Sequence, residues 1–405
     1  MVSKNIKILI GSTIAVIVTI GIGLGIYFGV KNTMDNNNNT NNKNGKRVVG
    51  YYQQTATSFN CSGIKSMTPD QIPAEYYTHL IYGFAPAIDT NTFDFKNPGS
   101  TEEYRYKLFN DNKKKNKNLM TGISIGGDLQ TVSPMSNAIK DENRNKFVIS
   151  CVNFAYKYNF NLIDIDFEYP NDQSRGGNSS DPDNLVKFIK ELRQEINKKT
   201  PKLLLSIALA GGEFWGVGYK TRELIDYVDF FNIMAYNVQG SWEHVTSCSS
   251  PLVSVNPATK DSVSEAVNYF TDNFQLNALK FNLGISFFGV SYKLQDAQKT
   301  GMTSPITSDP GLKGSCSRQD GYLAYFEIEQ LIKDNNVTPN TDNTAVCNYF
   351  VVNGTNWIAY DDTTTFSKKM DYLNQKGLGG TSIWGMDSDD PDTLKLTKYI
   401  SSRIK

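Results

Sequence analysis

Eight short, β-rich apolar segments alternate with amphipathic segments along residues 47–386, and this alternation restricts the fold more than any other feature. Between these segments, residues 182–198 and 262–274 have the apolar spacing of helices. Eight β–α units in one domain predict an α/β fold of the (β/α)8 TIM barrel type. The predicted strands are residues 47–53, 78–85, 119–126, 162–169, 202–209, 228–236, 281–288 and 381–386.

A long stretch separates the last two predicted strands. Residues 291–357 are too numerous for a simple loop, because most connections within compact domains are only a few residues long. We therefore expect a small inserted subdomain between strands 7 and 8, forming a wall on one side of the cleft.

The sequence before the first strand predicts a membrane anchor. Residues 8–30 contain no charged side chain and are long enough to cross a hydrocarbon core of about 30 Å. Lys4 and Lys7 precede this segment, which predicts a cytoplasmic N-terminus over residues 1–7 and a single-pass type II orientation. The alternative is a cleaved signal peptide, which would give a secreted protein.

An Asn-rich tract connects the predicted anchor to the rest of the chain. Residues 31–46 have no apolar face to bury, so we expect a flexible spacer. Residues 47–405 show no break in composition and are expected to be one domain on the extracellular or lumenal side of the membrane.

Composition argues against several classes of function. The chain has 41 basic and 41 acidic residues, so we expect no basic surface for nucleic acid. It has only two histidines, His79 and His244, and no CxxC motif, which leaves no support for the common zinc sites or for thioredoxin chemistry. We expect no metal, no organic cofactor and a monomer. Acid–base chemistry must then fall mostly to carboxylates and tyrosines.

The five cysteines are an odd number, so at least one is unpaired within the chain. Cys151 lies in a segment with helical apolar spacing and is expected to be a buried free thiol. Cys316 and Cys347 are close in sequence and form the candidate disulfide in an oxidising compartment.

Three acids alternate within the apolar segment NLIDIDFEYP, residues 161–170. Asp164, Asp166 and Glu168 share one face of a strand, because alternate side chains point to the same side. They lie at the C-terminal end of the fourth barrel strand, and TIM barrels carry their active sites at this end. Glu168 is the outermost of the three. Burial and like charge resist simultaneous ionisation, so we expect shared protons and a protonated Glu168 that serves as general acid near neutral pH.

Three alternatives compete with this interpretation of the acids. A purely structural row would carry a large desolvation cost. A divalent metal site usually gathers ligands from several strands. A two-carboxylate glycosidase needs a second acid across the cleft, and no comparable acid ends another strand before Asp387. The nucleophile would then come from the substrate.

The acid motif and several others resemble those of the family 18 glycoside hydrolases, the chitinase family. The match runs in order along essentially the whole domain, from GYY at 50–52 to the eighth strand. The quoted motifs are SIGG (124–127), LIDIDFEYP (162–170), MAYN (234–237) and GLGGTSIWGMDSDD (377–390). DGYLAYFEI (320–328) and NWIAYDD (356–362) resemble the inserted α+β subdomain of the family, and RGG at 175–177 resembles its killer-toxin-like fungal branch more weakly.

The resemblance implies a chitinase that hydrolyses β-1,4-linked N-acetylglucosamine by substrate-assisted, retaining catalysis, a known exception to the two-carboxylate scheme. Glu168 would protonate the leaving oxygen, and the 2-acetamido carbonyl of the substrate would attack the anomeric carbon to form an oxazolinium ion. Asp166 would orient the acetamido group, with Asp164 sharing its proton. Tyr236 would hydrogen-bond the acetamido carbonyl.

The candidate substrate-binding residues come from the same strand ends. Trp384 matches the floor on which the sugar stacks, and Met234 lines the pocket beside it. Without the resemblance, both would more often be core residues. Tyr51 and Phe84 either line the pocket or pack in the core. The remaining candidates are Asn237, Tyr169, Gly126 and Gly127.

Departures from the family pattern affect the cleft more than the acids. Asn237 stands where many members carry Asp, and the loss of that negative charge predicts a lower pKa for Glu168. Asp128, Phe288 and Val290 replace residues that are often Trp, Tyr and Arg, which thins the lining of the longer cleft. Two other functions stay open: a non-catalytic lectin for chitooligosaccharides, and an endo-β-N-acetylglucosaminidase acting on N-linked glycans.

Overall fold

The computed structural model describes residues 45–58, 67–127 and 132–404. The predicted cytoplasmic N-terminus at 1–7, the anchor at 8–30 and nearly all of the spacer at 31–46 therefore lie outside the described residues. Within the described ranges, no helix is both long enough and apolar enough to cross a membrane.

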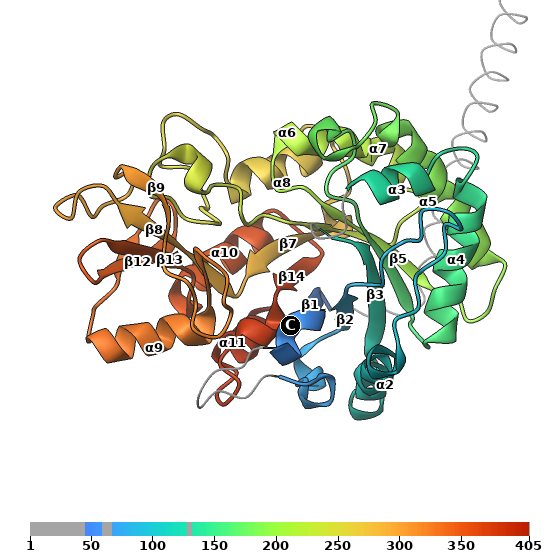
Figure 1. The fold of residues 1–405 in the computed structure, drawn as a ribbon, viewed down its shortest axis with the longest axis horizontal. Coiled ribbons are helices and arrows are strands. Elements are labelled where there is room, and N and C mark those ends of the chain that lie inside the picture. The colour runs from blue at the N-terminus through green and yellow to red at the C-terminus, as the bar shows by residue number, and fades with distance from the viewer. Residues whose placement is uncertain (1–44, 59–66, 128–131, 405) are drawn as a thin grey trace, which may run out of the picture. The chain divides into compact units, whose positions relative to one another are not determined.

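Eight parallel strands close into a barrel, which confirms the predicted TIM barrel (Figure 1). Their order around the barrel is β1, β14, β7, β6, β5, β4, β3, β2. Each strand lies within a predicted segment or within one residue of it. The strands are β1 (Arg47–Gln53), β2 (His79–Gly83), β3 (Met120–Gly126), β4 (Leu162–Asp166), β5 (Leu204–Leu209), β6 (Phe230–Ile233), β7 (Phe281–Ser286) and β14 (Gly380–Trp384).

Helices connect the strands and surround the barrel (Figure 1). In α5, apolar side chains recur every three or four residues and are buried, as expected for a helix with one face on a core. The helices are α2 (Ser100–Lys115), α3 (Val132–Ala138), α4 (Arg144–Lys157), α5 (Asp181–Asn197), α6 (Glu213–Gly216), α7 (Thr221–Leu224), α8 (Val263–Thr271), α10 (Thr363–Gln375) and α11 (Lys395–Arg403).

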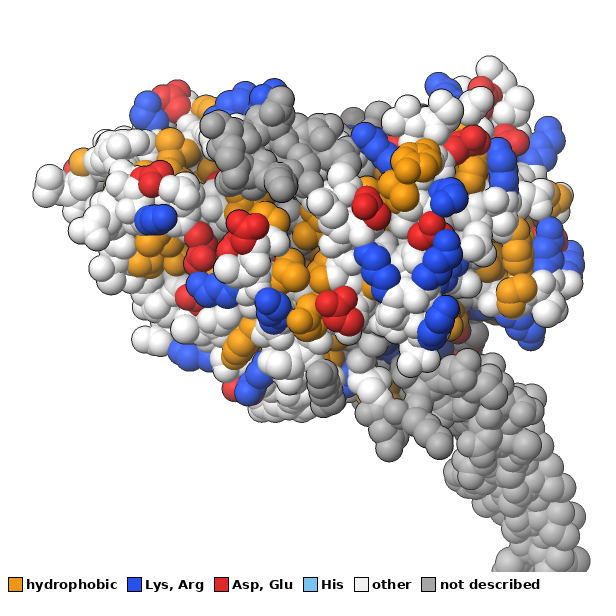
Figure 2. Space-filling view, turned by 90° about the horizontal axis from the view of Figure 1, so that it is seen from below, with side chains coloured by type: hydrophobic (Ala, Val, Ile, Leu, Met, Phe, Trp, Pro, Cys, Tyr) orange, Lys and Arg blue, Asp and Glu red, His pale blue; other side chains and the backbone are white. Residues whose placement is uncertain are grey.

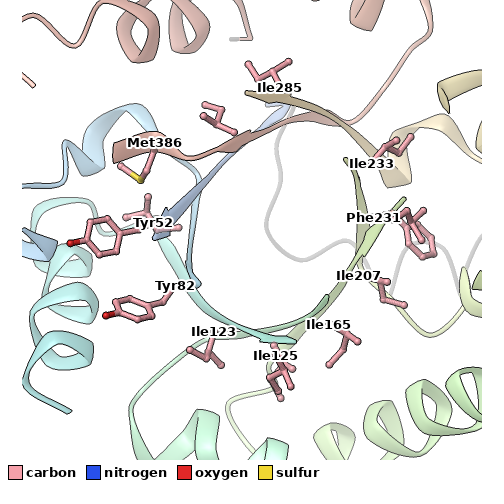
Figure 3. Packing of buried hydrophobic residues seen from close by; sticks show 14 of the residues in the cluster. Tyr52, Tyr82, Ile123, Ile125, Ile165, Ile207, Phe231, Ile233, Ile285 and Met386 are labelled. Carbon is pink, nitrogen blue, oxygen red and sulfur yellow. The ribbon is translucent and has the colours of Figure 1, made fainter. Parts of the chain in front are cut away.

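The main hydrophobic core lies between the barrel and its helices. Figure 3 shows Ile123, Ile165, Ile207 and Phe231 pointing out of the barrel wall, toward the surrounding helices. Since strand side chains alternate, the neighbouring residues point into the barrel. Inside it, a separate apolar cluster is formed by Val49, Tyr51, Ile81, Leu162 and Phe230. Polar side chains in the barrel interior therefore stand out from an apolar background.

A second, antiparallel sheet is inserted between β7 and β14 and lies beside the barrel, at the left of Figure 1. Its strands run in the order β10, β8, β13, β12, β11, and β9 pairs with β8. The sheet spans residues 288–360, slightly more than the expected 291–357. Its elements are β8 (Phe288–Leu294), β9 (Ile306–Pro310), β10 (Tyr322–Ala324), α9 (Tyr325–Asn335), β11 (Asn340–Asp342), β12 (Cys347–Val352) and β13 (Asn356–Tyr360).

Lys and Arg side chains are interspersed with Asp and Glu on the face seen in Figure 2. This mixture fits a chain with equal numbers of basic and acidic residues.

The predicted Cys316–Cys347 disulfide is wrong. Cys347 pairs with Cys248, 99 residues earlier, at a Cα–Cα distance of 6.5 Å, and Cys316 takes part in a different disulfide. Proximity in sequence was a poor guide, because the start of β12 packs against the loop after β6, where the amide of Leu252 donates to the carbonyl of Ala345 at 2.7 Å. Cys151 is free and buried, as predicted.

Replacing both Cys248 and Cys347 with Ala is expected to lower the free energy of unfolding by about 2–4 kcal/mol, because the crosslink restricts the unfolded chain over a long loop. Urea unfolding under non-reducing conditions measures the difference. Cys151→Ala serves as the control, since it removes a buried thiol without removing a crosslink. A double variant as stable as this control would contradict the expectation.

Candidate active site

The three acids of β4 extend from the barrel interior to its C-terminal rim. Asp164 is completely buried, Asp166 is 3% exposed, and Glu168 is half-buried two residues beyond the end of the strand. This order of depth is the one expected from the alternation of side chains along a strand. Glu168 is thus the acid of this row that is most accessible to a substrate.

Asp164 is held by three hydroxyl groups from three other strands. Its Oδ2 accepts hydrogen bonds from Tyr51 Oη and Ser124 Oγ, both at 2.9 Å, and its Oδ1 accepts one from Ser206 Oγ at 2.5 Å. Burial raises the pKa of Asp164, and these hydrogen bonds oppose the rise because they favour the carboxylate.

Ser124 and Ser206 were not among the predicted site residues. Their signal in the sequence is a serine within an apolar strand pattern, at ISIG and LLSIAL. The register places both serines beside Asp164 on the neighbouring strands β3 and β5. Knowing the register was therefore necessary to assign them.

Gly126 and Gly127 allow the backbone after β3 to lie directly against β4. A Cβ atom on Gly126 would lie 1.9 Å from the carbonyl oxygen of Asp166, and the Gly127 amide donates to the same oxygen at 2.7 Å. A Cβ on Gly127 would meet the ring of Phe84 at 2.5 Å. Both glycines also have positive φ, which L side chains rarely adopt. They are predicted site residues that shape the site through the backbone.

Aromatic rings from three strand ends meet beside the acids. Trp384, the last residue of β14, is half-buried. Its ring stacks on Phe84 at 5.6 Å between centroids and lies 5.8 Å from the ring of Tyr51. The structure therefore brings together three of the predicted substrate-binding residues.

The segment after β6 contributes further candidate residues. Met234 and Tyr236 are half-buried, and the pKa of Tyr236 is raised well above its ordinary value by burial and by the charges of Asp166 and Glu168. The charges of both acids therefore act on this phenol. The amide of Asn237 donates to Ser249 Oγ, whose hydroxyl donates to Asn237 Oδ1 at 3.0 Å, so the loop at 249 holds this residue.

The inserted sheet also reaches the site. The Tyr236 ring meets Phe288 edge-on at 6.1 Å, and Phe288 stacks on Tyr322 at 4.7 Å. Phe288 begins β8 and Tyr322 begins β10. The substitution of Phe at 288 therefore keeps an aromatic ring in the wall, and Tyr322 is a member that was not predicted. Asp128, another departure, lies outside the described residues.

The loop after Glu168 is fixed by Arg175. Its guanidinium donates to the Glu168 carbonyl oxygen and to Asp172 Oδ2, both at 2.6 Å. It also lies 5.6 Å from the ring centre of Tyr169, a predicted substrate-binding residue that is half-buried. These contacts fix the backbone that carries the outermost acid. Among the described residues, no three His, Cys, Asp or Glu side chains gather closely enough to hold a metal ion.

Asp387, three residues after Trp384, introduces a pH dependence of stability. It is buried and accepts hydrogen bonds from the amide and side chain of Gln53, both at 3.1 Å. Burial raises its pKa to about 7. Because the folded state then holds this proton more tightly than the unfolded chain does, stability should fall as the pH rises from about 4 through about 7.

An Asp387→Asn variant is expected to reduce this loss of stability between pH 4 and pH 7, which amounts to a few kcal/mol in the unmodified protein. Thermal unfolding between pH 4 and pH 8 measures it. Asp390→Asn is the matched control, since Asp390 is partly exposed in the same segment and should leave the slope unchanged. Equal slopes in all three proteins would contradict the assignment.

Comparison with known proteins shows which family and which structures this chain resembles. The sequence profile of the glycosyl hydrolases family 18 matches residues 47–389. The oviduct-specific glycoprotein of Mus musculus is 30% identical over 358 residues, which cover 85% of this chain and 47% of the mouse protein. The chain thus spans about half the length of this curated relative.

Two solved structures are similar over almost their whole length. The Ostrinia furnacalis Group IV chitinase has a TM-score of 0.82 and 28% identity, covering 89% of this chain and 99% of that one. Catalytic domain 2 of the Ostrinia furnacalis Group II chitinase, solved as a mutant in complex with (NAG)5, has a TM-score of 0.80 and 25% identity, covering 89% and 95%.

Proposed function

Because the chain belongs to glycosyl hydrolase family 18, we propose that it is a chitinase that cuts β-1,4-linked N-acetylglucosamine polymers by substrate-assisted, retaining catalysis. The observation that carries the proposal is the row of acids on β4. A half-buried Glu168 lies at the rim above two buried aspartates, and the charges of Asp166 and Glu168 act on the phenol of Tyr236.

In the proposed reaction, Glu168 donates its proton to the glycosidic oxygen as the bond to the anomeric carbon breaks. The carbonyl oxygen of the substrate's 2-acetamido group forms a new bond to that carbon, giving an oxazolinium ion. Asp166 accepts a hydrogen bond from the acetamido N–H and stabilises the positive charge, while Tyr236 donates to the acetamido oxygen. Glu168 then takes a proton from the water that opens the ring, so the product keeps the β-configuration.

The site offers a separate surface for the sugar itself. Trp384 stacks on Phe84 at the strand ends, with the buried ring of Tyr51 beside Trp384, and an aromatic face suits the apolar face of a sugar ring. Met234 belongs to the same pocket in this proposal. The complex of a similar Ostrinia domain with (NAG)5 supports an N-acetylglucosamine oligomer as the occupant.

We also propose that residues 8–30 tether the protein to a membrane, with the catalytic domain on the extracellular or lumenal side. The Cys248–Cys347 disulfide supports that side, because disulfides persist in oxidising compartments. Treating intact cells with a protease and following an antibody epitope at the C-terminus tests the orientation. An epitope that is protected in intact cells but digested in sealed microsomes, which expose their cytoplasmic side, would contradict it.

Hydrolysis can be tested with residues Lys46–Lys405, which form one compact unit. The protein is secreted so that disulfides form, and it is incubated with chitotetraose and chitohexaose. Shorter oligomers that appear first as the β-anomer support the proposal. Oligomers that bind but stay intact indicate a lectin, and a protein that neither binds nor cuts them would next be tested as an endo-β-N-acetylglucosaminidase on N-linked glycans.

A further inference from the structure

A chain of hydrogen bonds runs through the barrel interior and ends on Asp164. Arg47 Nε donates to Asn282 Oδ1 at 2.9 Å, and Asn282 Nδ2 donates to Asn232 Oδ1 at 2.8 Å. Asn232 Nδ2 donates to Tyr51 Oη at 2.8 Å, and Tyr51 Oη donates to Asp164 Oδ2 at 2.9 Å. The chain links residues of β1, β7, β6 and β4, so it begins at a cation and ends at a carboxylate.

The direction of every hydrogen bond in this chain follows from its first donor. Arginine has no acceptor, so Asn282 must present its oxygen to Arg47 and its NH2 group to Asn232. Asn232 must then present its own NH2 group to the oxygen of Tyr51. With that oxygen accepting a hydrogen bond, the hydroxyl proton of Tyr51 points to Asp164.

The two asparagines are unusual in their surroundings. Asn232 and Asn282 are 1% and 0% exposed, in a barrel interior that also contains the apolar cluster with Val49 and Phe230. Inward layers of such barrels are usually filled by branched apolar residues. A chain of satisfied polar groups gains little stability over an apolar core, so stability alone is a weak reason for it.

The other charged and titratable groups around Asp164 are few. Asp166 lies above it on β4 and Glu168 lies just beyond the end of that strand. The phenol of Tyr51 contacts Asp164 from β1, and the phenol of Tyr236, after β6, is under the influence of its charge. Ser124 and Ser206 on the neighbouring strands are neutral. These groups are either acidic or uncharged at neutral pH.

Arg47 is the cation that contacts this chain of hydrogen bonds, and Asp229 and Lys280 are charged neighbours that interact with it. Burial lowers the pKa of Arg47 to about 10, so it stays charged at neutral pH. Burial also lowers the pKa of His79 on β2 to about 3, so this residue stays neutral. Arg47 is therefore the cation that polarises the chain.

We propose that Asn282, Asn232 and Arg47 are positioning residues that direct the Tyr51 proton to Asp164 and hold Asp164 as the ionised member of the acid row. The proton shared between the two buried aspartates then resides on Asp166 until substrate arrives, and it passes to Asp164 when Asp166 becomes the acceptor for the acetamido N–H. The consequence for catalysis rests on the proposed function, whereas the effect on the charge of Asp164 does not.

A double-mutant cycle measures that effect without catalysis. Asn282→Leu keeps the side-chain volume and breaks the chain, which should raise the pKa of Asp164 in the folded state. A raised pKa loses stability as pH increases, so the rise in the unfolding constant should be about three- to tenfold larger near pH 8 than near pH 4. In an Asp164→Asn background, this dependence on pH should disappear.

Ile81→Val is the matched control, because Ile81 lies in the same interior cluster outside the hydrogen-bond chain, and its cost should not depend on pH. A pH-independent cost of Asn282→Leu would overturn the proposal. If that variant does not fold, Arg47→Gln retains a donor for Asn282 and removes the charge. The Arg47→Gln variant should show a smaller pH dependence of its stability cost, of the same sign. A cost that does not depend on pH would also overturn the proposal.

Catalysis gives a second readout. In Asn282→Leu, the acidic limb of the pH profile of kcat/KM on chitohexaose should move to higher pH by about half a unit to one unit, because the pair of aspartates keeps its second proton longer. Ile81→Val should keep the original profile. An unmodified protein that does not cut chitohexaose contradicts the proposed function, and the stability cycle still decides this inference.

Discussion

A Glu168→Gln variant is expected to lose about a hundred- to ten-thousandfold in kcat/KM on chitohexaose while retaining its affinity for the oligomer. Glutamine keeps the size and hydrogen-bonding capacity of the side chain but cannot donate a proton to the leaving oxygen. The aromatic floor of Trp384 and Phe84 is unchanged, so binding should persist. Reducing-end release measures turnover, and calorimetry at a fixed pH measures affinity.

Glu213→Gln is the control for this change. Glu213 is an exposed glutamate in α6, after β5, and is not part of the acid row. Its variant should cut chitohexaose at the original rate. If Glu168→Gln retained that rate as well, Glu168 would not be the general acid, and the proposed mechanism would fail.

A Lys369→Met variant is expected to lower the free energy of unfolding by about 3–5 kcal/mol, because it leaves Asp361 buried without its cation. Lys369 Nζ donates to Asp361 Oδ2 at 2.6 Å and to the carbonyl of Ser250 at 2.5 Å. Lys369 is fully buried and Asp361 nearly so. Burial lowers the pKa of Lys369 and raises that of Asp361, so each depends on the other to stay charged.

The neighbouring Lys368 provides the comparison. It is exposed and donates to Asn343, so Lys368→Met should change stability by less than about 1 kcal/mol. Replacing both partners, as Lys369→Met with Asp361→Leu, should recover much of the loss, since no unpaired charge is then buried. A single Lys369 variant as stable as the Lys368 variant would show that the buried pair adds nothing to stability.

The barrel could be predicted from the sequence because its strands are short, separate and apolar. The predicted strands extended beyond the true ends of β4 and β6, where residues such as Glu168 and Tyr236 no longer pair with a neighbouring strand. Side chains that turn toward a site retain the composition of a strand, so propensity alone cannot show where pairing stops.

The site was predicted to a lesser extent. The acids could be assigned because carboxylates at alternating positions of an apolar strand are costly. Ser124, Ser206 and Asn282 gave no comparable signal, since their roles depend on the register between strands that are far apart in sequence. The prediction of the disulfide failed for the same reason, because the distance between Cys248 and Cys347 is set by the fold.

The two ends of the inserted sheet lie beside each other. Its first strand, β8, begins two residues after β7 ends, and it pairs with the last strand, β13, where Val290 faces Ala359. The inserted segment therefore leaves the barrel and returns to it at one place. Its aromatic residues Phe288 and Tyr322 therefore meet the site from a different sheet than the acids on β4. Under the proposed function, bond cleavage depends on the acids of β4, whereas part of the wall beside the sugar chain comes from a sheet that the barrel strands do not form.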